Sequence, residues 1–310
     1  MTVALFTHPA CLGHDNGPGH PERPDRLRAV LRALESEVFS TLAREDAPEA
    51  TVEQLTRAHP ERYVEGLLSI NVPEGERVML DPDTGMSTGS RAAALRSAGA
   101  AVAAVDAVMQ GWARAAFCAT RPPGHHAEAA RPMGFCLFGN AAVAAHHARA
   151  PWGVARVAVL DFDVHHGNGS QAILEGDPGF FYASTHEMPL YPGTGNPSER
   201  GCDNNVLNVA LDPFAGGPEF RAAWGDTIIP AVRGWRPGLI IVSAGFDAHA
   251  RDPLASLQVQ TPDFSWLSHA LVELADEVCE GRLVSLLEGG YDLAALAEST
   301  AAHVRALMRV

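Results

Sequence analysis

The sequence contains few cysteines, and their arrangement excludes several classes of protein. Five cysteines are scattered over 310 residues, an odd number, and no two of them form a Cys-x-x-Cys pair. A small disulfide-stapled fold and a cysteine-based zinc site are therefore not expected. Reduced thiols, and with them a cytoplasmic location, are the prediction.

Positive charge and long apolar runs are also scarce. Lysine and arginine number 23 against 37 aspartates and glutamates, which gives a formal net charge of −14. Nucleic acid is not expected as a partner because phosphate binding requires a basic surface, whereas a cationic substrate would not be repelled. The chain shows neither an apolar run that would span a membrane nor a signal peptide, so no membrane association is predicted.

Hydrophobic residues make up 46% of the chain, enough for a large core, and they recur in short runs. Short apolar runs are typical of strands in a parallel sheet that is covered on both faces. Such runs lie at residues 3–7, 115–120, 157–160, 180–184, 239–243 and 283–287. Helical spacing or alanine richness predicts helices at 24–36, 91–109, 135–148, 219–232 and 262–280.

The alternation of these segments predicts an α/β fold, with a mostly parallel central sheet and helices on both faces. The sequence has no repeat, low-complexity block or obvious linker, so residues 1–310 are predicted to form a single domain. Two long segments, 186–205 and 248–262, are expected to surround a pocket, since loops of that length in a compact domain are usually functional.

Polar groups gather where the predicted strands end. The apolar run at 157–160 leads directly into Asp-Phe-Asp-Val-His-His-Gly at 161–167. In an open α/β sheet, ligands bind at the carboxyl ends of the strands. Side chains alternate along an extended chain, which puts Asp163 and His165 on one face. This pair is predicted to supply two ligands of a metal site.

Other strand ends supply a histidine pair, a carboxylate and a phenol, namely His125-His126, Asp247 and Tyr291. Asp163, His165 and Asp247 can form a three-ligand zinc site with the open position that catalytic zinc sites keep. Two carboxylates would leave the metal less acidic, which makes a separate base useful. One tandem histidine can take a proton from water while the other donates one.

Seven motifs, in order, carry a resemblance to a known family. They are His-Pro-Glu-Arg-Pro at 20–24, Arg-Pro-Pro-Gly-His-His at 121–126, Gly-Phe-Cys-Leu-Phe-Gly-Asn at 134–140, Asp-Phe-Asp-Val-His-His-Gly-Asn-Gly at 161–169, Tyr-Pro-Gly-Thr-Gly at 191–195, Ser-Ala-Gly-Phe-Asp-Ala-His at 243–249 and Glu-Gly-Gly-Tyr at 288–291. The chain resembles the arginase–deacetylase superfamily, specifically zinc-dependent histone-deacetylase-like amidohydrolases of bacterial class II type. The resemblance runs from about His8 to about Leu296.

The resemblance implies the arginase–deacetylase fold, with a sheet of roughly eight strands. It also implies hydrolysis of the N-acetyl amide of acetyl-lysine, or of a similar acylated amine, with release of acetate. One catalytic zinc ion would be held by Asp163, His165 and Asp247. His126 would be the general base, and Asp161 would hold the ring N–H of its neighbour His125. Tyr291 would hydrogen-bond the substrate carbonyl and then the oxyanion, with Arg26 buried beneath the metal.

The resemblance further implies a narrow channel for an acyl-lysine stem. Phe135 would form one wall, with Tyr191 as a candidate for the facing wall, and Asp83 matches the rim position that grips the substrate amide. The remaining substrate contacts would be Gly134, Leu254 and Gly289. A structural potassium ion is also implied, held by the Ser184 hydroxyl and by backbone carbonyls around Asp161, Asp163, His165 and Thr185. Assembly into a dimer or tetramer is left open.

Three positions distinguish the chain within the family it resembles. Asn168 stands where class I relatives carry an aspartate behind the second histidine, which fits class II and leaves His126 with less support by charge. Tyr291 is not the histidine of weakly active relatives, so full activity is expected. Leu254 occupies a gate position where polyamine-selective relatives can carry glutamate, and it favours an acetyl-lysine or another less charged stem.

Three alternative functions stay open. An acetylpolyamine amidohydrolase would use the same chemistry on a small cationic amine, although Leu254 counts against it. A manganese ureohydrolase would need two metals, and His166 and Asn168 stand where a further carboxylate ligand is expected. A non-catalytic reader of acylated amines is disfavoured because every catalytic position is filled. His186 and His249 are interpreted as loop histidines near the mouth rather than as substrate contacts.

Overall fold

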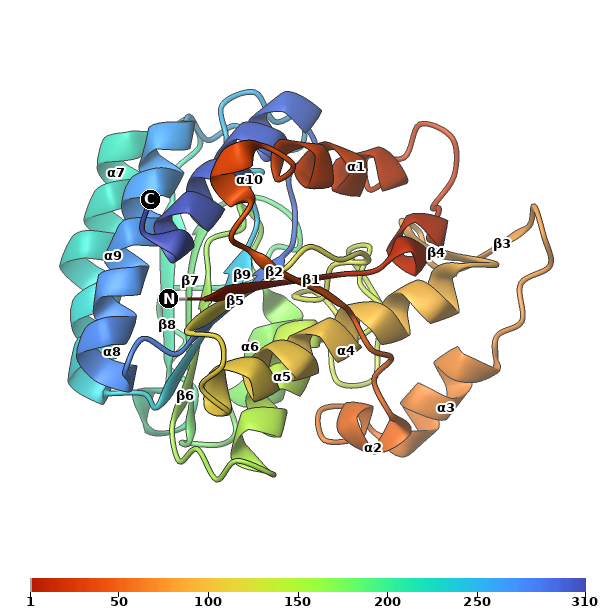
Figure 1. Cartoon of the computed structure of the whole chain (residues 1–310), viewed down its shortest axis with the longest axis horizontal. Coiled ribbons are helices and arrows are strands. Elements are labelled where there is room, and N and C mark those ends of the chain that lie inside the picture. Colours follow the sequence, from red (N-terminus) through yellow and green to blue (C-terminus); the bar gives the residue numbers. More distant parts are fainter. Residues whose placement is uncertain (1) are drawn as a thin grey trace.

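The computed structural model describes residues 2–310 and contains a central eight-stranded sheet between two layers of helices (Figure 1). Its strands are β1 (Val3–Thr7), β2 (Ala43–Asp46), β5 (Ala115–Cys118), β6 (Val157–Asp161), β7 (Phe180–Glu187), β8 (Val206–Leu211), β9 (Leu239–Ala244) and β10 (Leu283–Leu287). They lie in the order β2-β1-β5-β10-β9-β6-β7-β8, and each neighbouring pair is parallel. The predicted fold class is confirmed.

The sequence predicts the six inner strands and misses the two at the edges. β2 is mostly exposed along its length, and β8 alternates between buried and partly exposed residues. Neither therefore has the continuous apolar run of a strand that is covered on both faces. The separate antiparallel hairpin of β3 (Arg77–Asp81) and β4 (Thr84–Ser87) is also missed, since β3 is largely exposed.

Helices cover both faces of the sheet. One face carries α1 (Pro24–Ala33), α7 (Gly217–Ala222), α8 (Ile229–Trp235), α9 (Thr261–Cys279) and α10 (Leu293–Met308). The other carries α2 (Val52–Leu55), α3 (Glu61–Ser69), α4 (Ser90–Met109), α5 (Asn140–Arg149) and α6 (Asn168–Leu174). Each layer has its own apolar core against the sheet, so the strands are buried from both sides. The short 3-10 helices are Pro9–Gly13, Glu37–Phe39 and Cys202–Asn204.

Two predicted helices need correction. The helix predicted at 135–148 begins only at Asn140, because Gly134 and Phe135 have left-handed φ angles of 55° and 68° that no right-handed helix contains. The helix predicted at 219–232 is α7 and α8 joined by a π-helical stretch, Ala223–Ile228. Pro230 follows this stretch and has no backbone N–H to continue the ladder. The helices α2, α3, α6 and α10 lie outside the predicted segments.

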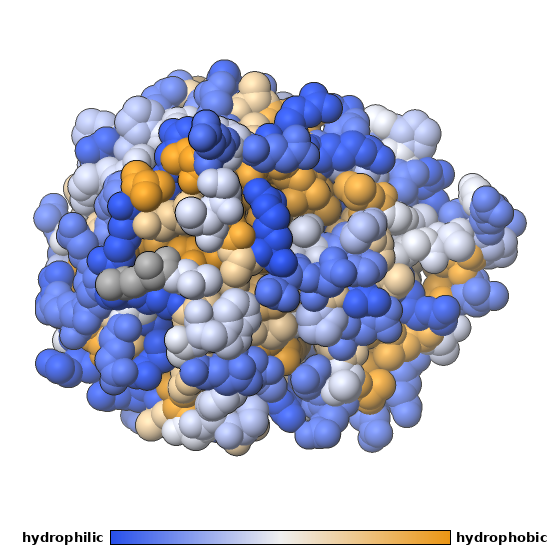
Figure 2. Space-filling model, in the orientation of Figure 1, coloured by the Kyte–Doolittle hydropathy of each residue, from blue (hydrophilic) through white to orange (hydrophobic). Residues whose placement is uncertain are grey.

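The prediction that no segment is long and apolar enough to span a membrane is also corrected. By length and composition alone α4 passes that test, but 67% of its most apolar window is buried inside the protein. α4 packs against α5 and the sheet, as Figure 1 shows, and its alanines allow this close approach. The face drawn in Figure 2 is largely hydrophilic, with apolar residues in separate groups rather than a continuous band. Burial in the core accounts for the composition of α4.

Candidate active site and metal centre

The turn after β6 is built by its own carboxylates. Asp161 Oδ1 accepts a hydrogen bond from the backbone N–H of Asp163 at 3.1 Å, and Asp163 Oδ1 accepts one from the N–H of His165 at 2.9 Å. Short polar side chains that bond the backbone two residues on are a standard way to fix a tight turn. The spacing Asp-x-Asp-x-His thus holds its own side chains at the carboxyl edge of the sheet.

Asp247, from the turn after β9, completes a cluster of three buried ligand groups with Asp163 and His165. One ligand atom from each of the three residues lies within 4.8 Å of the others. His165 Nδ1 is 3.1 Å from Asp163 Oδ1 and 3.2 Å from Asp247 Oδ2. The other oxygen of Asp247 accepts a hydrogen bond from the N–H of Val164 at 2.9 Å.

The chemistry of this cluster fits a divalent cation. Within residues 2–310, Asp247 Oδ2 is buried and has no hydrogen-bond partner, an arrangement that is costly unless another ligand satisfies the oxygen. Burial disfavours a charged His165, but its hydrogen bond to Asp163 and the negative charges of Asp163 and Asp247 outweigh it and raise its pKa to about 10. Two carboxylates that stabilise a proton on His165 this strongly would also stabilise a zinc ion. Zinc binding would then displace that proton from His165.

Two glycines allow the strand ends to approach these carboxylates. The N–H of Gly289 donates to Asp163 Oδ2 at 2.8 Å, and a Cβ at Gly289 would clash with the carboxylates of Asp163 and Asp247. A Cβ at Gly245 would clash with Asp163 in the same way. Gly289, predicted as a substrate contact, thus lies directly behind the ligand carboxylates and is not among the residues that line the pocket.

His125 has a charged partner. Its Nδ1 donates to Asp161 Oδ2 at 3.0 Å, and both side chains are buried. Burial disfavours the imidazolium, yet the charges of Asp163 and Asp161 outweigh burial and raise the pKa of His125 well above its usual range. The contact predicted between Asp161 and His125 is therefore present in the structure.

His126 has a neutral partner. Its Nδ1 donates to Asn168 Oδ1 at 2.9 Å, and its ring centroid lies 4.0 Å from that of His125. Burial, followed by the neighbouring charges of His125 and His165, lowers the pKa of His126 well below its usual range. The hydrogen bond to Asn168 leaves Nε2 as the ring nitrogen without a proton, which is the form a general base requires.

Tyr291 faces the pocket from the loop after β10. Burial and the charges of Asp247 and Asp163 raise the pKa of its phenol well above its usual range, although the Arg26 guanidinium opposes them. The guanidinium carbon of Arg26 lies 4.7 Å from the centre of the Tyr291 ring. Arg26 also donates to the carbonyl oxygens of Gly290 at 2.6 Å and Glu288 at 2.5 Å. The phenol is thus a neutral donor on a loop that a buried arginine holds.

These groups meet at a cavity of about 230 Å³. Its lining residues are Asp83, His126, Gly134, Phe135, His165, Tyr191, Leu254 and Tyr291. The Phe135 and Tyr291 rings have centroids 6.0 Å apart, and the His126 and Tyr191 rings 5.2 Å apart. Aromatic and aliphatic walls thus lead down to the histidine and the tyrosine. Each residue predicted to line the channel, apart from Gly289, lies here.

The β3–β4 hairpin fixes one side of the cavity's mouth. The N–H of Phe135 donates to Thr84 Oγ1 at 3.0 Å, and the Thr84 hydroxyl donates to Asp83 Oδ1 at 3.0 Å. His20 donates from Nε2 to the Asp83 carbonyl at 3.2 Å and packs edge-on against Phe135, with centroids 4.7 Å apart. Burial and the nearby Asp81 raise the pKa of Asp83. The predicted rim and wall residues are therefore coupled.

Of the residues predicted to hold potassium, Asp163 and His165 belong to the metal cluster and Asp161 lies next to it. Asp161 at the end of β6 is in register with Ser184 on β7, and the next residue, Thr185, accepts a hydrogen bond from the buried Trp224 ring at 3.0 Å. Ser184 Oγ is 3.0 Å from Nδ1 of His186, which is buried and does not line the cavity. His249 is likewise outside the cavity lining, where its Nδ1 accepts from the Arg251 N–H.

Three carboxylates and an arginine near the site were not predicted. Glu288 Oε2 accepts from the N–H groups of Gly124 and His125 at 2.7 and 3.2 Å, and burial raises its pKa to about 7. Glu22 is fully buried and pairs with Arg121 and Arg26. Glu128 accepts from Asn168 at 2.9 Å. Glu22 and Glu288 lie in motifs quoted above, but only the fold shows that their carboxylates are buried.

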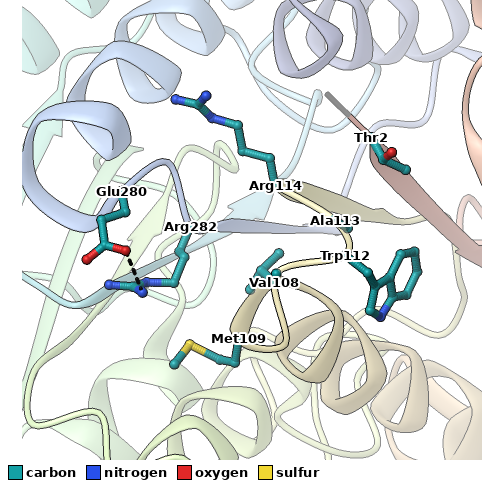
Figure 3. Close-up of a pocket in the computed structure, with 9 residues that line it drawn as sticks. Thr2, Val108, Met109, Trp112, Ala113, Arg114, Glu280 and Arg282 are labelled. Carbon is teal, nitrogen blue, oxygen red and sulfur yellow. Dashed lines mark hydrogen bonds and ion pairs between the residues drawn. The ribbon is translucent and has the colours of Figure 1, made fainter.

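A larger hollow, of about 480 Å³, lies at the opposite edge of the sheet. Figure 3 shows it between the end of α4 and the starts of β5 and β10, with Arg114, Arg282 and Glu280 around it. Glu280 is 82% exposed and pairs with Arg282 at 3.2 Å. The lining residues include neither a histidine nor a cysteine, and the groups of the metal cluster are all at the other edge. We therefore place the functional site at the carboxyl edge.

The fold and this site define an α/β metallohydrolase with a histidine pair. The chain belongs to the histone deacetylase family, because the histone deacetylase domain matches residues 20–307. It is 39% identical to the histone deacetylase-like amidohydrolase of Pseudomonas aeruginosa, over 93% of this chain and 81% of that protein. It is 38% identical to histone deacetylase 14, chloroplastic, of Arabidopsis thaliana, over 98% of this chain and 76% of that protein.

A solved structure agrees with the family assignment. The HDA15 HD domain superposes with a TM-score of 0.93 at 32% identity, covering 99% of this chain and 88% of that one. The chain is thus an amidohydrolase of the histone deacetylase family, in which zinc dependence is general. Relatives include bacterial and chloroplastic proteins, so the cytoplasmic location stays a prediction.

Proposed function

We propose that this protein is a zinc-dependent deacetylase that hydrolyses the N-acetyl amide of acetyl-lysine, or of a similar acylated amine, and releases acetate. One observation carries the proposal: three buried metal-ligand groups meet a histidine pair and a neutral tyrosine at the base of an apolar-walled cavity. Each of these parts has a distinct task in amide hydrolysis.

The cluster of Asp163, His165 and Asp247 would hold the zinc ion. When bound, zinc supplies Lewis-acid polarisation of the carbonyl and lowers the pKa of water. His126 is the general base, because its lowered pKa keeps it neutral and its Nδ1–H is committed to Asn168. Its Nε2 therefore accepts a proton from the attacking water.

Tyr291 binds the oxygen of the scissile amide. Its raised pKa keeps the phenol protonated, so that it donates a hydrogen bond as negative charge develops on that oxygen. The water oxygen becomes bonded to the acyl carbon, and the carbon–nitrogen bond breaks. A histidine returns the proton to the leaving nitrogen, which gives acetate and a free amine. His125, with its raised pKa and its bond to Asp161, supplies positive charge beside this transfer.

The walls of the cavity support a lysine side chain as the acyl carrier. Phe135, Tyr191 and Leu254 surround the path to the metal cluster with apolar surface, which suits an aliphatic stem. Asp83, at the mouth, can accept hydrogen bonds from the backbone amide of a peptide substrate. A small acetylated polyamine would bring a positive charge, which an acetyl-lysine stem lacks, past the apolar side chain of Leu254.

A potassium ion beside Asp161 and Ser184 is part of the proposal, as a structural element of the family. The register of β6 with β7 supports it, because that register aligns the backbone carbonyls of the two strand ends. Refolding in potassium and in sodium salts would test it, with thermal stability as the readout. We expect a higher melting temperature in potassium, and equal values would contradict the assignment.

Paired turnover tests the substrate. Zinc-loaded protein would be assayed with an acetyl-lysine peptide and with N-acetylputrescine, and acetate release would be measured for both. We expect the peptide to be preferred, as the apolar gate at Leu254 requires. A preference for acetylputrescine would make this a polyamine enzyme and overturn the assignment of Leu254. No acetate from either substrate would overturn the proposed function.

A further inference from the structure

A carboxylate stands behind the partner of the general base. His126 Nδ1 donates to Asn168 Oδ1 at 2.9 Å, and Asn168 Nδ2 donates to Glu128 Oε1, also at 2.9 Å. Asn168 is buried and opens α6, whereas Glu128 is half-buried in the loop two residues after His126. The three side chains form a continuous hydrogen-bonded series that runs from the cavity towards the surface.

The two ends of an asparagine side chain are nearly the same shape but opposite in hydrogen bonding. The oxygen only accepts and the nitrogen only donates. An ionised carboxylate only accepts, so the Glu128 carboxylate requires the Asn168 nitrogen to face it. The Asn168 oxygen is then left to face His126. The second proton on Nδ2 is directed at Met133 Sδ, 3.4 Å away, so both donors of this nitrogen are used in one orientation.

The orientation of this amide decides which nitrogen of His126 can act as a base. With the oxygen facing the ring, Nδ1 carries the proton and Nε2 is free to accept another. If the amide rotated by half a turn, its nitrogen would donate to Nδ1, and the proton would have to move to Nε2. The ring nitrogen on the cavity side would then be occupied, and His126 could not accept a proton from water.

We propose that Glu128 is a positioning residue for the general base, because it fixes the orientation of Asn168 and thereby the tautomer of His126. The inference rests on the proposed function for the role of His126 but adds a residue that the family resemblance did not assign. This role also explains why His126 has a neutral partner. The negative charge is on Glu128, which contacts Asn168 and not His126 itself.

The backbone places Glu128 rigidly enough for this task. The N–H of Glu128 donates to the carbonyl of Arg131 at 3.0 Å, which closes a tight turn. The preceding N–H, from Ala127, donates to the carbonyl of Gly124 at 3.1 Å. α6 packs directly on this loop, because a Cβ at Gly169 would clash with the Ala127 carbonyl. The loop of the histidine pair and the start of α6 are therefore packed tightly against each other.

Three substitutions at Glu128 separate hydrogen bonding from charge. Glu128→Gln keeps an acceptor for Asn168, so we expect kcat within about threefold of the parent. Glu128→Ala removes the acceptor and should reduce kcat by about 10–100-fold with little change in KM, the size of loss typical for a group that orients a site residue. Glu128→Lys presents a donor, favours the rotated amide and should cost the most.

A control is available at the end of α6. Glu175 is also half-buried and also accepts from a buried side-chain amide, that of Gln171, at 3.1 Å, and the same nitrogen donates to Glu199 at 2.7 Å. Gln171 contacts His166, which does not line the cavity. Glu175→Ala should therefore leave kcat within about twofold of the parent. An equal loss in both alanine variants would mean that each acts only through the stability of the fold, and the inference would fail.

A second background tests the mechanism of the effect. In Asn168→Asp the group facing His126 accepts in either orientation, so nothing is left for Glu128 to orient. Adding Glu128→Ala should then cause no further loss, and should raise kcat because two neighbouring carboxylates repel each other. The cycle predicts a cost in the parent and none in the aspartate background. The same cost in both backgrounds would overturn the proposal.

The tautomer itself can be observed without turnover. Long-range proton–nitrogen NMR spectra of protein with ¹⁵N-labelled histidine, assigned to His126 by its loss in His126→Asn, distinguish a protonated Nδ1 from a protonated Nε2. We expect Nδ1–H in the parent and in Glu128→Gln, and Nε2–H in Glu128→Lys. If the parent released no acetate but these spectra changed as expected, the proposed function would fail and the inference about Glu128 would stand. An unchanged tautomer in Glu128→Lys would overturn the inference.

Discussion

Charged side chains are buried at the carboxyl edge of the sheet and exposed at its amino edge. At the carboxyl edge, Asp161, Asp163 and Asp247 are at most 1% exposed around a cavity of about 230 Å³. At the amino edge, a hollow of about 480 Å³ is bordered by Glu280, which is 82% exposed and pairs with Arg282. The larger hollow is bordered by solvated charges, whereas the smaller one lies above carboxylates that are almost entirely buried.

This difference identifies the functional site better than the size of either hollow. Burying a carboxylate costs several kcal/mol unless a cation or hydrogen bonds offset it. A chain that places three such groups beside two histidines therefore gives up stability for chemistry. An exposed ion pair such as that of Glu280 and Arg282 contributes at most about 1 kcal/mol and implies no ligand.

The largest effect is expected from a substitution that removes a ligand from the cluster at the carboxyl edge. Asp247→Ala removes one of three ligands, so zinc binding and acetate release should both be lost. Zinc content after dialysis, measured by elemental analysis, checks this. The matched change at the amino edge, Glu280→Gln, should leave zinc content and turnover unchanged. A full zinc equivalent retained by Asp247→Ala would show that the metal lies elsewhere.

A smaller loss is expected when the cluster is kept but the oxyanion donor is removed. Tyr291→Phe should lower kcat by about 10²–10³ because one hydrogen bond to the developing charge is lost. Zinc content should stay at the parent value, since Tyr291 is not one of the three ligand residues. Kinetics and metal analysis on the same sample measure both. Full activity of this variant would refute the role of Tyr291.

A substitution at the mouth of the cavity should change the preference between two substrates more than the rate. Leu254→Glu would add a carboxylate to an apolar wall, and the ratio of kcat/KM for N-acetylputrescine over the acetyl-lysine peptide should rise by about tenfold, or about 1.4 kcal/mol. Leu254→Gln is the control for polarity without charge and should shift the ratio much less. Equal shifts in both variants would show that charge at this gate does not select the substrate.

The smallest effect is expected on the pH dependence of stability, because the core keeps His303 uncharged. Burial lowers the pKa of His303 to about 3, and its two ring nitrogens lie 2.7 and 2.8 Å from the hydroxyl oxygens of Ser268 and Ser285. The unfolded histidine binds a proton below about pH 6.5 while the folded one does not, so the unfolded state is favoured as the pH falls. This costs about 1.4 kcal/mol per pH unit between those two pKa values.

Urea unfolding at pH 7.5 and pH 5.0 measures this effect. The parent should lose more stability between the two values than His303→Gln, by roughly 2 kcal/mol, because the variant has no group to protonate on unfolding. The variant should be less stable at pH 7.5, where the neutral histidine is best accommodated. Parallel pH dependences would show that His303 is not held neutral in the core.

The sequence predicts the inner part of the molecule well, and the reason is physical. β5, β6, β9 and β10 are covered on both faces, so their apolar runs are continuous and easily read. The polar groups that follow them must meet at one edge if the sheet is parallel. The cluster of Asp163, His165 and Asp247 therefore follows from strand order and spacing.

What the sequence does not predict depends on contacts between distant segments. Glu288, Glu22 and Glu128 are recognisable as site residues only when the fold brings them to Gly124, Arg121 and Asn168. Phe135 was predicted in a helix, yet its left-handed backbone is what places the residue on the cavity wall. In edge strand β8 the buried Asn208 interrupts the apolar run, so the segment does not have the pattern of a strand covered on both faces.

On the proposed function, one zinc ion at the carboxyl edge makes this chain a deacetylase. The most direct test titrates zinc into metal-free protein while acetate release from an acetyl-lysine peptide is followed. We expect no turnover before addition, a linear rise, and a plateau at one equivalent of zinc per chain. Turnover in the metal-free protein, or a plateau only at two equivalents, would contradict the account.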